Sequence, residues 1–479
     1  MCAQPAGWLP YDAHMNQAAF DAYLDANRER LLEDYKDFLR QPSVAATGQG
    51  IPEMAALVAR RLASLGAEVK IVPTEGDAPP VVWAELGPAD AERTLLIYNH
   101  YDVQPAEPFD LWESPPFEPT VRDGHIFARG AADDKGELVS RIHAVEAWQS
   151  TQGALPIRIK WLIEGEEEVG SPHFHKWVAA HKDWFTNTRG GVIDGCLWEF
   201  GGFDEKERFR LSLGVKGICY VELRVKGVDH DLHSSLAPLA KNAAWRLTWA
   251  LASIKDIHEN ILIEGYYDHV RQPTPAEEEI MREMPFEGDQ EEWYKQNWKV
   301  DEFVGGVHGY EALKKLLFSP TATICGLTSG WQGAGTKTVL PALASAKVDF
   351  RLVPNLTPEI TLDLLRRHLD KHGFTDIEIE WLGGYRAEIC DPAAPMVMAA
   401  TVAARRIHGH EPIIDLLSPG SGPMYTLSSF IGGVPVVCAG IAHADTRIHS
   451  PNENASLKNF FAGIRYAGAL FEALAVQKK

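Results

Sequence analysis

The stretch I-R-I-K-W-L-I-E-G-E-E-E-V-G-S, residues 157–171, joins an apolar run to three adjacent glutamates, and the other motifs of the chain are arranged around it. The β-branched and aromatic residues of 157–163 predict a β-strand. Three carboxylates directly after a buried strand repel one another unless protons or cations neutralise them. A solvated acidic turn is one interpretation. The strand before the glutamates and the Gly170-Ser171 turn after them favour a metal centre, with one carboxylate as ligand and a neighbour as base.

Strands and helices alternate through the first part of the chain. The predicted strands cover residues 68–72, 81–86, 94–98, 157–163 and 191–197, and the predicted helices cover residues 16–40, 52–65, 130–148 and 174–181. This alternation predicts an α/β fold whose mostly parallel sheet has helices on both faces. Functional groups of such sheets gather at the carboxyl ends of the strands. The candidates that follow predicted strand ends are His100, Glu167, Glu168 and Glu199.

The pattern changes near residue 208. Strands are predicted at residues 211–225, 346–352 and 375–381, and helices at 239–254 and 358–372. Together they predict a self-contained α+β unit of the ferredoxin-like type. An acidic, aromatic-rich segment, residues 256–317, interrupts this unit, and the sequence leaves its role open. The α/β pattern then resumes with helices at 394–408 and 457–476 and a strand at 434–440.

This organisation predicts one α/β domain that is split by an inserted domain. The expected parts are a catalytic domain at residues 16–207 and 389–479 and an insertion at 208–388. A chain of 479 residues is too long for one ordinary core, which agrees with two domains.

The composition narrows the class of protein. Hydrophobic residues make up 45% of the chain and charged residues 23%, as in globular proteins that function in water. No apolar run approaches the roughly 20 residues of a membrane-spanning helix, and no signal peptide is recognised. The six scattered cysteines predict reduced thiols and a cytoplasmic location. The net charge of −20 argues against nucleic acid or a membrane surface as partner.

Carboxylates and histidines along the chain could together hold metal ions. The candidates are His100, Asp133, Glu166, Glu167, Glu168, Glu199 and His449. This mixture suits Zn²⁺, with Mn²⁺ or Co²⁺ as possible replacements. Because the set is larger than one tetrahedral ion needs, we expect two divalent ions that share a bridging carboxylate. Each motif also has an ordinary interpretation, such as a surface pair, a helix N-cap or a plain turn.

Six motifs in one order carry a resemblance to a known family. They are H-Y-D-V-Q-P (100–105), G-A-A-D-D-K-G (130–136), E-E-V-G-S (167–171), D-L-H-S (231–234), F-R-L-V-P-N (350–355) and H-S-P-N-E (449–453). The chain resembles the aminoacylase, carboxypeptidase G and carnosine dipeptidase family of dinuclear zinc metallopeptidases over about residues 18–474. The motifs at 100–105 and 350–355 point to its cytosolic dipeptidase branch.

The resemblance implies roles for the metal-site residues. His100, Asp133 and Glu199 would hold one ion, and Asp133, Glu168 and His449 the other. Asp102 would orient a ligating imidazole. Glu167 would be the general base that activates a metal-bridging water. Two points stay open, because Glu166 makes the usual glutamate pair a triplet and Asp194 is a rival to Glu199 as ligand.

The resemblance also implies how substrate is bound. His233 would stabilise the oxyanion, often from the partner subunit of a homodimer formed through the inserted lid domain. Arg351, Thr338 and the Gly420-Ser421 segment would hold the substrate carboxylate. For Arg351, an ordinary ion pair within its strand is an equal alternative.

We therefore expect a metallopeptidase that hydrolyses dipeptides or similar small amides with a free carboxylate. An N-acyl or N-carbamoyl amino acid deacylase is the nearest alternative, because it uses the same chemistry with a different amine-side pocket. A non-catalytic binding protein on the same fold is the alternative from another class. The complete set of ligands and base argues against that last interpretation.

Overall fold

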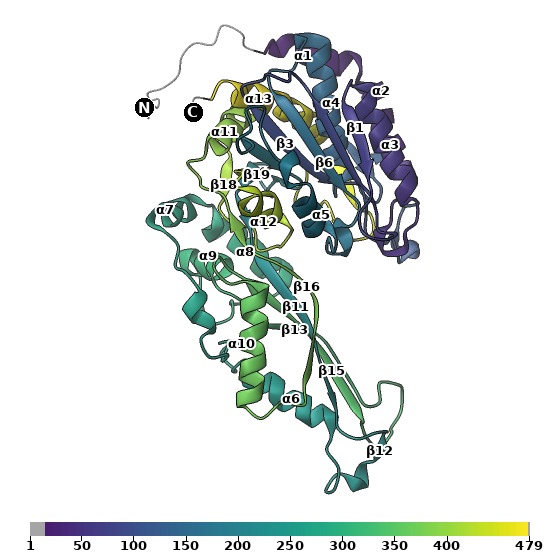
Figure 1. Cartoon of the computed structure of the whole chain (residues 1–479), viewed down its shortest axis with the longest axis vertical. Coiled ribbons are helices and arrows are strands. Elements are labelled where there is room, and N and C mark those ends of the chain that lie inside the picture. The colour runs from purple at the N-terminus through teal and green to yellow at the C-terminus, as the bar shows by residue number, and fades with distance from the viewer. Residues whose placement is uncertain (1–14, 478–479) are drawn as a thin grey trace. The chain divides into compact units, whose positions relative to one another are not determined.

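The computed structural model describes residues Met15–Gln477, which form two compact units (Figure 1). Unit 1 contains the described residues up to Leu213, Cys390–Ile414 and those from Thr426 onward. Unit 2 contains Gly214–Ile389 and Asp415–Tyr425. The expected division at 207/208 and 388/389 lies near these borders. The segment Asp415–Tyr425 differs, since the sequence patterns assign it to the α/β domain and the structure groups it with unit 2.

Unit 1 is built on a nine-stranded sheet with the order β1-β2-β6-β3-β7-β19-β9-β18, in which β8 pairs with β9. The central strands β6, β3, β7 and β19 run parallel, and β1, β2 and β9 pair antiparallel at the flanks. The strands are β1 (Glu68–Val72), β2 (Val81–Leu86), β3 (Thr94–His100), β6 (Arg158–Glu164), β7 (Gly195–Trp198), β8 (Gly202–Phe203), β9 (Phe209–Ser212), β18 (Ile413–Asp415) and β19 (Val436–Cys438). The predicted α/β fold is confirmed.

The helices of unit 1 follow the predicted pattern with two differences. They are α1 (Gln17–Ala26), α2 (Arg28–Arg40), α3 (Ile51–Ser64), α4 (Lys135–Gln152), α5 (Phe174–Ala180), α11 (Pro395–His408) and α13 (Leu457–Ala475). A further short helix, α12 (Met424–Leu427), was not predicted and begins in the segment that is grouped with unit 2. The single helix expected over 16–40 is two helices, because Asn27 leaves helical geometry at φ −108° and ψ 8°. The helix expected from residue 130 begins only at Lys135, since the residues before it form a turn.

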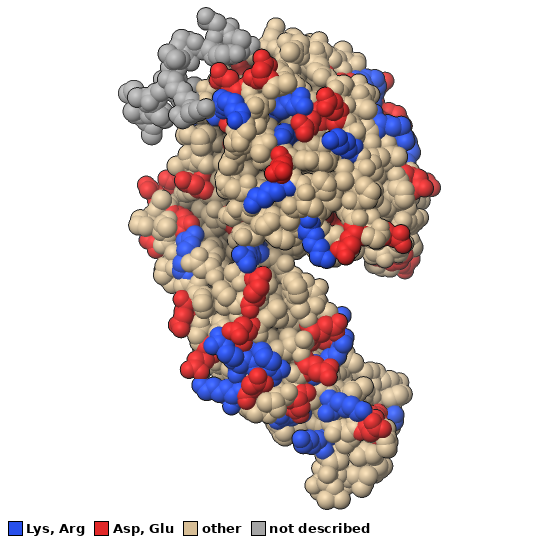
Figure 2. All heavy atoms as spheres, in the orientation of Figure 1, with Lys and Arg blue, Asp and Glu red and all other residues tan. Residues whose placement is uncertain are grey.

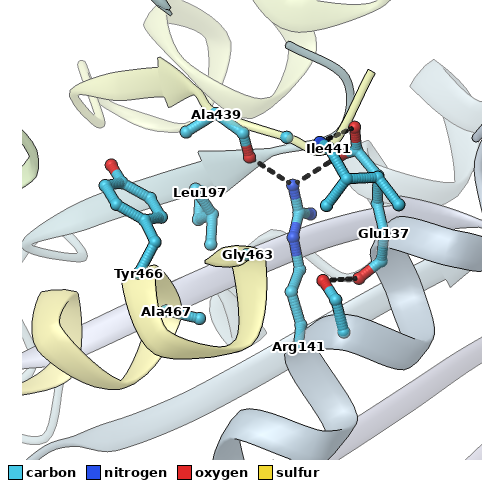
Figure 3. A pocket seen from close by; sticks show the side chains of 10 residues that line it. Glu137, Arg141, Leu197, Ala439, Ile441, Gly463, Tyr466 and Ala467 are labelled. Carbon is cyan, nitrogen blue, oxygen red and sulfur yellow. Dashed lines mark hydrogen bonds and ion pairs between the residues drawn. The ribbon is translucent and has the colours of Figure 1, made fainter. Parts of the chain in front are cut away.

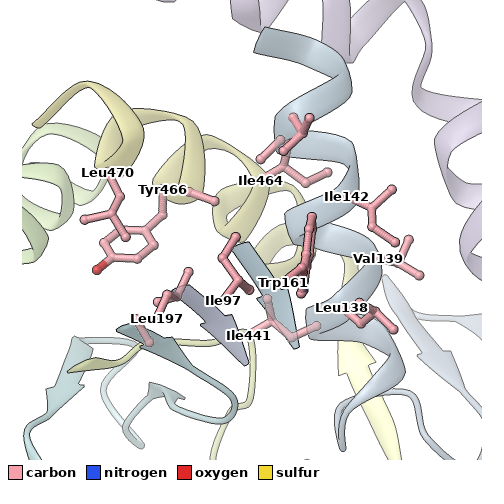
Figure 4. Close-up of a cluster of buried hydrophobic side chains, with 14 of the residues drawn as sticks. Ile97, Leu138, Val139, Ile142, Trp161, Leu197, Ile441, Ile464, Tyr466 and Leu470 are labelled. Carbon is pink, nitrogen blue, oxygen red and sulfur yellow. The ribbon is translucent and has the colours of Figure 1, made fainter. Parts of the chain in front are cut away.

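The main core lies where α4 and α13 pack on the sheet (Figure 4). The strands contribute Ile97, Trp161 and Leu197, and the helices contribute Ile142 and Ile464. All five side chains are fully buried. Burying each such side chain contributes about 1.5–3 kcal/mol, so this packing fixes the sheet whose strand ends carry the candidate ligands.

A small three-stranded sheet brings the C-terminal motif to the first part of the chain. Its order is β20-β5-β4, with β4 (Thr120–Arg122), β5 (His125–Phe127) and β20 (Asn454–Ser456). The backbone N–H of Ala128 donates to the carbonyl of Glu453 at 3.1 Å. Residues 449–453 and the 130–134 turn are therefore held together although they are far apart in sequence.

Unit 2 has the predicted ferredoxin-like arrangement. Its elements follow the order β11 (Gly217–Lys226), α6 (Ala243–Ile254), β13 (Thr323–Ser329), β15 (Leu343–Leu352), α10 (Pro358–Lys371) and β16 (Glu378–Tyr385). The strands form an antiparallel sheet of order β13-β15-β11-β16. A βαββαβ chain with this strand order is a ferredoxin-like fold. Two short pairs complete the unit, β10 (Gly214–Val215) with β17 (Glu388–Ile389) and β12 (Leu232–His233) with β14 (Val339–Leu340).

The segment 256–317, whose role the sequence left open, folds mainly into helices. They are α7 (Pro275–Glu283), α8 (Glu291–Trp298) and α9 (Gly309–Phe318). Their own core includes Met281 and Leu313, and it also takes in Leu416 and Leu417 from the segment that returns to unit 2. These helices thus anchor the start of the loop that follows Leu417, because they pack against Leu416 and Leu417.

The surface carries mixed charge. Figure 2 shows basic and acidic side chains interspersed over the face in view. Among the described residues, no helix combines the length and the apolar character needed to cross a membrane.

Candidate functional site

Three neighbouring parallel strands of unit 1 end at the candidate ligands. Strand β3 ends at His100, β7 is followed by Glu199, and β6 is followed by a short 3-10 turn, Glu167–Val169. The register pairs His100 with Glu164. Because parallel strands finish at the same edge of a sheet, the three groups of side chains lie close together.

Asp133 lies between the two candidate histidines. Its Oδ1 is 3.0 Å from Nε2 of His100, and its Oδ2 is 3.0 Å from Nε2 of His449. Each imidazole also lies near a further carboxylate, with Glu199 Oε2 at 3.8 Å from His100 and Glu168 Oε2 at 2.9 Å from His449. All five predicted ligands are therefore brought together in two clusters that share one carboxylate.

Asp134 is a further carboxylate within reach of His100 and Glu199, with ligand atoms that all lie within 4.8 Å of one another. Its Oδ2, however, accepts hydrogen bonds from Asn99 at 2.7 Å and from the backbone N–H of His100 at 2.9 Å. Asp134 thus holds the end of β3, and Asp133 is the carboxylate that faces both imidazoles.

The electrostatics of the cluster fit bound cations. Burial raises the pKa of Glu199 well above its usual range, and burial with nearby Asp133 raises that of Glu168. Hydrogen bonds to Asp133 and Glu168 raise the pKa of His449 to about 10. Glu199 Oε2 is buried without a hydrogen-bond partner. These carboxylates need positive charge, and an imidazole and carboxylate set is the one that Zn²⁺ and similar divalent ions prefer.

Asp102 supports two parts of the site. Its buried carboxylate lies 3.4 Å from Nδ1 of His100, as expected of a group that orients a ligating imidazole. It also accepts hydrogen bonds from the backbone N–H groups of Glu167 at 3.3 Å and Glu168 at 3.0 Å. The second contact fixes the turn that carries the expected base, and the sequence motifs did not indicate it.

Glu166 and Asp194, the two open points of the sequence, have partners of their own. Glu166 Oε1 lies 2.9 Å from Nδ1 of His173. Asp194 pairs with Arg93 at 2.8 Å and accepts from the backbone N–H of Thr94, the first residue of β3. Asp194 is thus at the opposite end of that strand from His100, and the cluster contains Glu199 instead.

Glu453 is a supporting residue to which sequence reasoning gave no role. Its buried carboxylate accepts from Arg129 at 2.7 Å and from the backbone N–H groups of Gly130, Ala132 and Asp133 at 3.1–3.2 Å. It therefore fixes the turn that presents Asp133. The glutamate stands in the 449–453 motif, so its position was visible in the sequence while its partners were not. In the same motif, His449 adopts a φ of 61°, an uncommon backbone conformation outside glycine that is concentrated at functional sites.

Arg141 joins the ends of three strands, and Figure 3 shows its contacts with Ala439 and Glu137. It donates to the carbonyl oxygens of Tyr98 at 2.8 Å, Trp198 at 2.6 Å and Ala439 at 3.3 Å. Its guanidinium also pairs with Glu137 at 3.1 Å, next to a small cavity. Tyr98 and Trp198 directly precede the Asn99-His100 pair and Glu199, so one buried cation holds the backbone of both strand ends.

The expected substrate residues all lie in unit 2. Arg351 Nη1 donates to Ser421 Oγ at 3.0 Å, and its Nε and Nη2 lie 3.1 Å from Asp349. Arg351 therefore forms the ion pair of the alternative interpretation and also contacts the 420–421 segment. Gly420 donates its backbone N–H to Ser418 at 3.2 Å.

His233 and Thr338 form a second pair at the other end of unit 2. Thr338 Oγ1 lies 3.3 Å from Nε2 of His233, and both residues are exposed. They adjoin the Leu343 end of β15, whereas Arg351 is near its other end. Eight residues of strand correspond to roughly 26 Å. Within one chain, Thr338 is thus not brought to Arg351.

Comparison with known proteins gives one family and several close relatives. The model of peptidase family M20/M25/M40 matches residues 96–473. Beta-Ala-His dipeptidase of Homo sapiens is 30% identical, with 95% of this chain and 92% of that protein covered. Cys-Gly metallodipeptidase dug1 of Schizosaccharomyces pombe is 28% identical, with 92% and 95% covered.

Among solved structures, the M20 family metallo-carboxypeptidase Sso-CP2 from Sulfolobus solfataricus is similar over most of the chain. It has a TM-score of 0.87 and 34% sequence identity, and the match covers 93% of this chain and 99% of that chain. The similarity extends through both units, because so little of either chain is left uncovered.

Proposed function

The chain belongs to peptidase family M20/M25/M40 and is a hydrolase, and from this premise we propose that it cleaves the amide bond of dipeptides or similar small amides with a free carboxylate, with two divalent cations in its active site. The observation that carries the proposal is the position of Asp133 between His100 and His449. The relatives, two dipeptidases and a carboxypeptidase, support this substrate class.

The proposed ligands are His100, Asp133 and Glu199 for one cation and Asp133, Glu168 and His449 for the other. Zn²⁺ is the proposed ion, with Mn²⁺ or Co²⁺ as replacements. When bound, such ions lower the pKa of water and polarise the carbonyl that is attacked. Asp102 keeps His100 in orientation through the contact at Nδ1.

Glu167 is the proposed general base. Its carboxylate takes the proton of the attacking water and then delivers it to the leaving amine nitrogen. The Asp102 contact to its backbone and the 3-10 turn hold it beside Glu168, which faces His449. The position of Glu167, next to the ligands and without an imidazole contact of its own among the interactions described, supports the role of base over that of ligand.

Arg351 and Ser421 are proposed to bind the substrate carboxylate, with the backbone at Gly420 beside them. A guanidinium fork is suited to a carboxylate, and Arg351 keeps about a third of its side chain exposed although it pairs with Asp349. This contact would select free acids over amides and esters at the carboxyl side of the cleaved bond.

A homodimer is proposed because two pairs of expected substrate-binding residues lie far apart in unit 2. Arg351 and Ser421 are near one end of β15, and His233 and Thr338 are near the other. If His233 and Thr338 act on the same substrate as Arg351, then they come from a second chain. Unit 2 also exposes apolar surface, with Trp245 and Trp249 of α6 stacked at 5.8 Å and more than half exposed. Burial of these side chains against a symmetric partner would produce two equivalent sites. The cytoplasmic location suggested by the cysteines stays a prediction.

A substrate panel tests the proposal. The protein is loaded with zinc or manganese and assayed with dipeptides, their C-terminal amides, N-acetyl amino acids and N-carbamoyl amino acids. We expect dipeptides with a free carboxylate to be the best substrates, by about a hundredfold over their amides. A clear preference for N-acetyl or N-carbamoyl amino acids would establish the deacylase alternative instead.

A further inference from the structure

Lys216 is a buried cation in unit 2 that the proposed function does not use. Only 3% of the residue is exposed. It lies between β10 and β11, and its Nζ donates to the carbonyl of Ser319 at 2.7 Å. Its backbone N–H donates to the carbonyl of Ser418 at 3.0 Å. Lys216 therefore contacts the loop that also carries Ser421.

The strand register makes Lys216 a neighbour of Arg351. Gly217 pairs with Leu352 and Ile218 pairs with Arg351 across β11 and β15. Lys216 directly precedes β11 and lies two residues before Ile218, which makes it a diagonal neighbour of Arg351, and the two charges are close enough to interact. Such diagonal neighbours have Cβ atoms about 7–8 Å apart or less. Lys216 thus lies behind the exposed guanidinium, with the 418–421 loop in contact with both.

The charges around this pair are unbalanced. Arg351 is paired with Asp349. For Lys216, the described part of the chain offers no carboxylate at ion-pair distance, and its one side-chain bond is to a neutral carbonyl. Burial, with Arg351 nearby, lowers the pKa of Lys216 to about 8. The two cations, Lys216 and Arg351, are therefore accompanied by one paired carboxylate, that of Asp349. An unpaired buried charge is unfavourable for folding, so its presence calls for a ligand of opposite charge.

We propose that Lys216 is a specificity-determining residue that makes the Arg351 pocket select an anionic group, the carboxylate of the substrate. The proposal rests on the proposed function of Arg351. Lys216 does not touch the substrate, because its side chain is enclosed. It supplies a second positive charge at short range, in surroundings where charge is weakly screened. The alternative is a structural role, in which Lys216 only ties the residues at 319 and 418 together.

The test measures discrimination between acid and amide. Wild type, Lys216→Met and Lys216→Arg are loaded with zinc and assayed on one dipeptide and its C-terminal amide. Where amide turnover is too slow, the inhibition constants of the released amino acid and of its amide supply the same ratio. Methionine keeps the length of the buried stem and removes the charge, and arginine keeps the charge.

We expect Lys216→Met to reduce the acid-to-amide ratio of kcat/KM by about tenfold, through a higher KM for the acid. The unfolding midpoint should be unchanged or higher, since a buried unpaired charge is removed. Lys216→Arg should retain most of the ratio. A ratio that stays at the wild-type value in Lys216→Met, whether both rates fall together or neither changes, would overturn the inference.

Arg351→Met, measured in parallel, separates this inference from the proposed function. If the ratio collapses in Arg351→Met and not in Lys216→Met, the carboxylate site stands and Lys216 has only a structural role. If the ratio is unchanged in Arg351→Met, the carboxylate site itself is wrong, and the inference about Lys216 falls with it.

Discussion

At the scale of single residues, the three adjacent glutamates have different partners. Glu168 faces His449, Glu166 bonds to His173, and Glu167 lies between them on the turn that Asp102 holds. Because their positions differ in this way, the same chemical change at each should give a different result.

Glu167→Gln should reduce kcat by at least the ~10²–10⁴-fold that a general base contributes, with metal content nearly unchanged. Glu168→Gln should weaken metal binding as well, because a ligand is lost. Glu166→Gln is the matched control and should retain metal and most of the activity. Metal analysis after dialysis, together with steady-state rates, measures both properties. If Glu167→Gln lost metal and Glu168→Gln kept it, then the roles of base and ligand would be assigned to the wrong one of these two neighbouring residues.

His408 gives a pH dependence of stability away from the metal ligands. It stacks on Phe209 with ring centroids 4.2 Å apart, and its Nε2 is buried without a partner. Burial, and then His410, lowers its pKa to about 4. The unfolded chain takes up this proton below about pH 6.5 and the folded chain only near pH 4. The contribution of neutral His408 to the free energy of unfolding is therefore complete above about pH 7 and is lost as the pH falls from 6.5 to 4.

Wild type should thus lose about 1–2 kcal/mol more unfolding free energy between pH 7.5 and pH 5 than His408→Phe does. Urea unfolding at a series of pH values measures the difference. If the unfolding free energies of the two proteins changed equally with pH, then His408 would not be buried in its neutral form.

Residue identities at the site were more predictable than residue contacts. Residue type and position at predicted strand ends pointed to His100, Glu167, Glu168 and Glu199, and the family resemblance implied the roles of these residues together with Asp133 and His449. The roles of Glu453 and Asp134 depend on backbone N–H groups that converge from other parts of the chain. Such convergence has no signature in the spacing of residues, which is why it appeared only in the structure.

At the scale of elements, Arg141 on α4 joins the ends of β3, β7 and β19. Arg141→Met should lower the unfolding free energy by about 3–5 kcal/mol, because it leaves Glu137 buried without its partner. Denaturant titration measures this loss. The double variant with Glu137→Leu should lose less than the sum of the two single variants. If the losses of unfolding free energy in the two single variants simply added in the double variant, then Arg141 and Glu137 would not interact.

Long periodic elements were predictable, and interrupted ones were not. The central strands of the sheet follow from their continuous apolar runs, which are buried on both faces, and the helices α10, α11 and α13 follow from the helical spacing of their apolar residues. The helices of 256–317 were missed because their apolar residues pack mainly on one another and on Leu416-Leu417. Thr274 and Glu277 form a capping box at the start of α7, and this spacing was a readable signal for that helix.

At the scale of the whole molecule, β9 before unit 2 and β18 and β19 after it lie in one sheet, which is the arrangement that an inserted domain produces. The grouping of 415–425 with unit 2 was not predicted. Leu416 and Leu417 are buried against helices that the sequence patterns did not predict. The sequence of the segment therefore did not indicate that it packs in unit 2.

Subunit mixing tests the proposed homodimer. His233→Ala and Glu167→Gln should each be inactive alone. After subunit exchange, a mixed dimer has one site with both an intact Glu167 and an intact His233 from the partner, so one site of two should recover. Activity measured against a label that proves exchange decides the matter. Proven exchange without recovery would mean that His233 acts within its own chain or has no part in catalysis.

The central claim is that two divalent cations share Asp133 and carry the hydrolysis. Titration of carefully stripped protein with zinc, followed by metal analysis and by peptide hydrolysis in the same samples, tests it most directly. The account predicts two ions per chain at saturation, full activity only when both are present, and one fewer ion in Glu168→Gln. A stoichiometry that stays at one ion per chain under saturating zinc, with full activity, would contradict it.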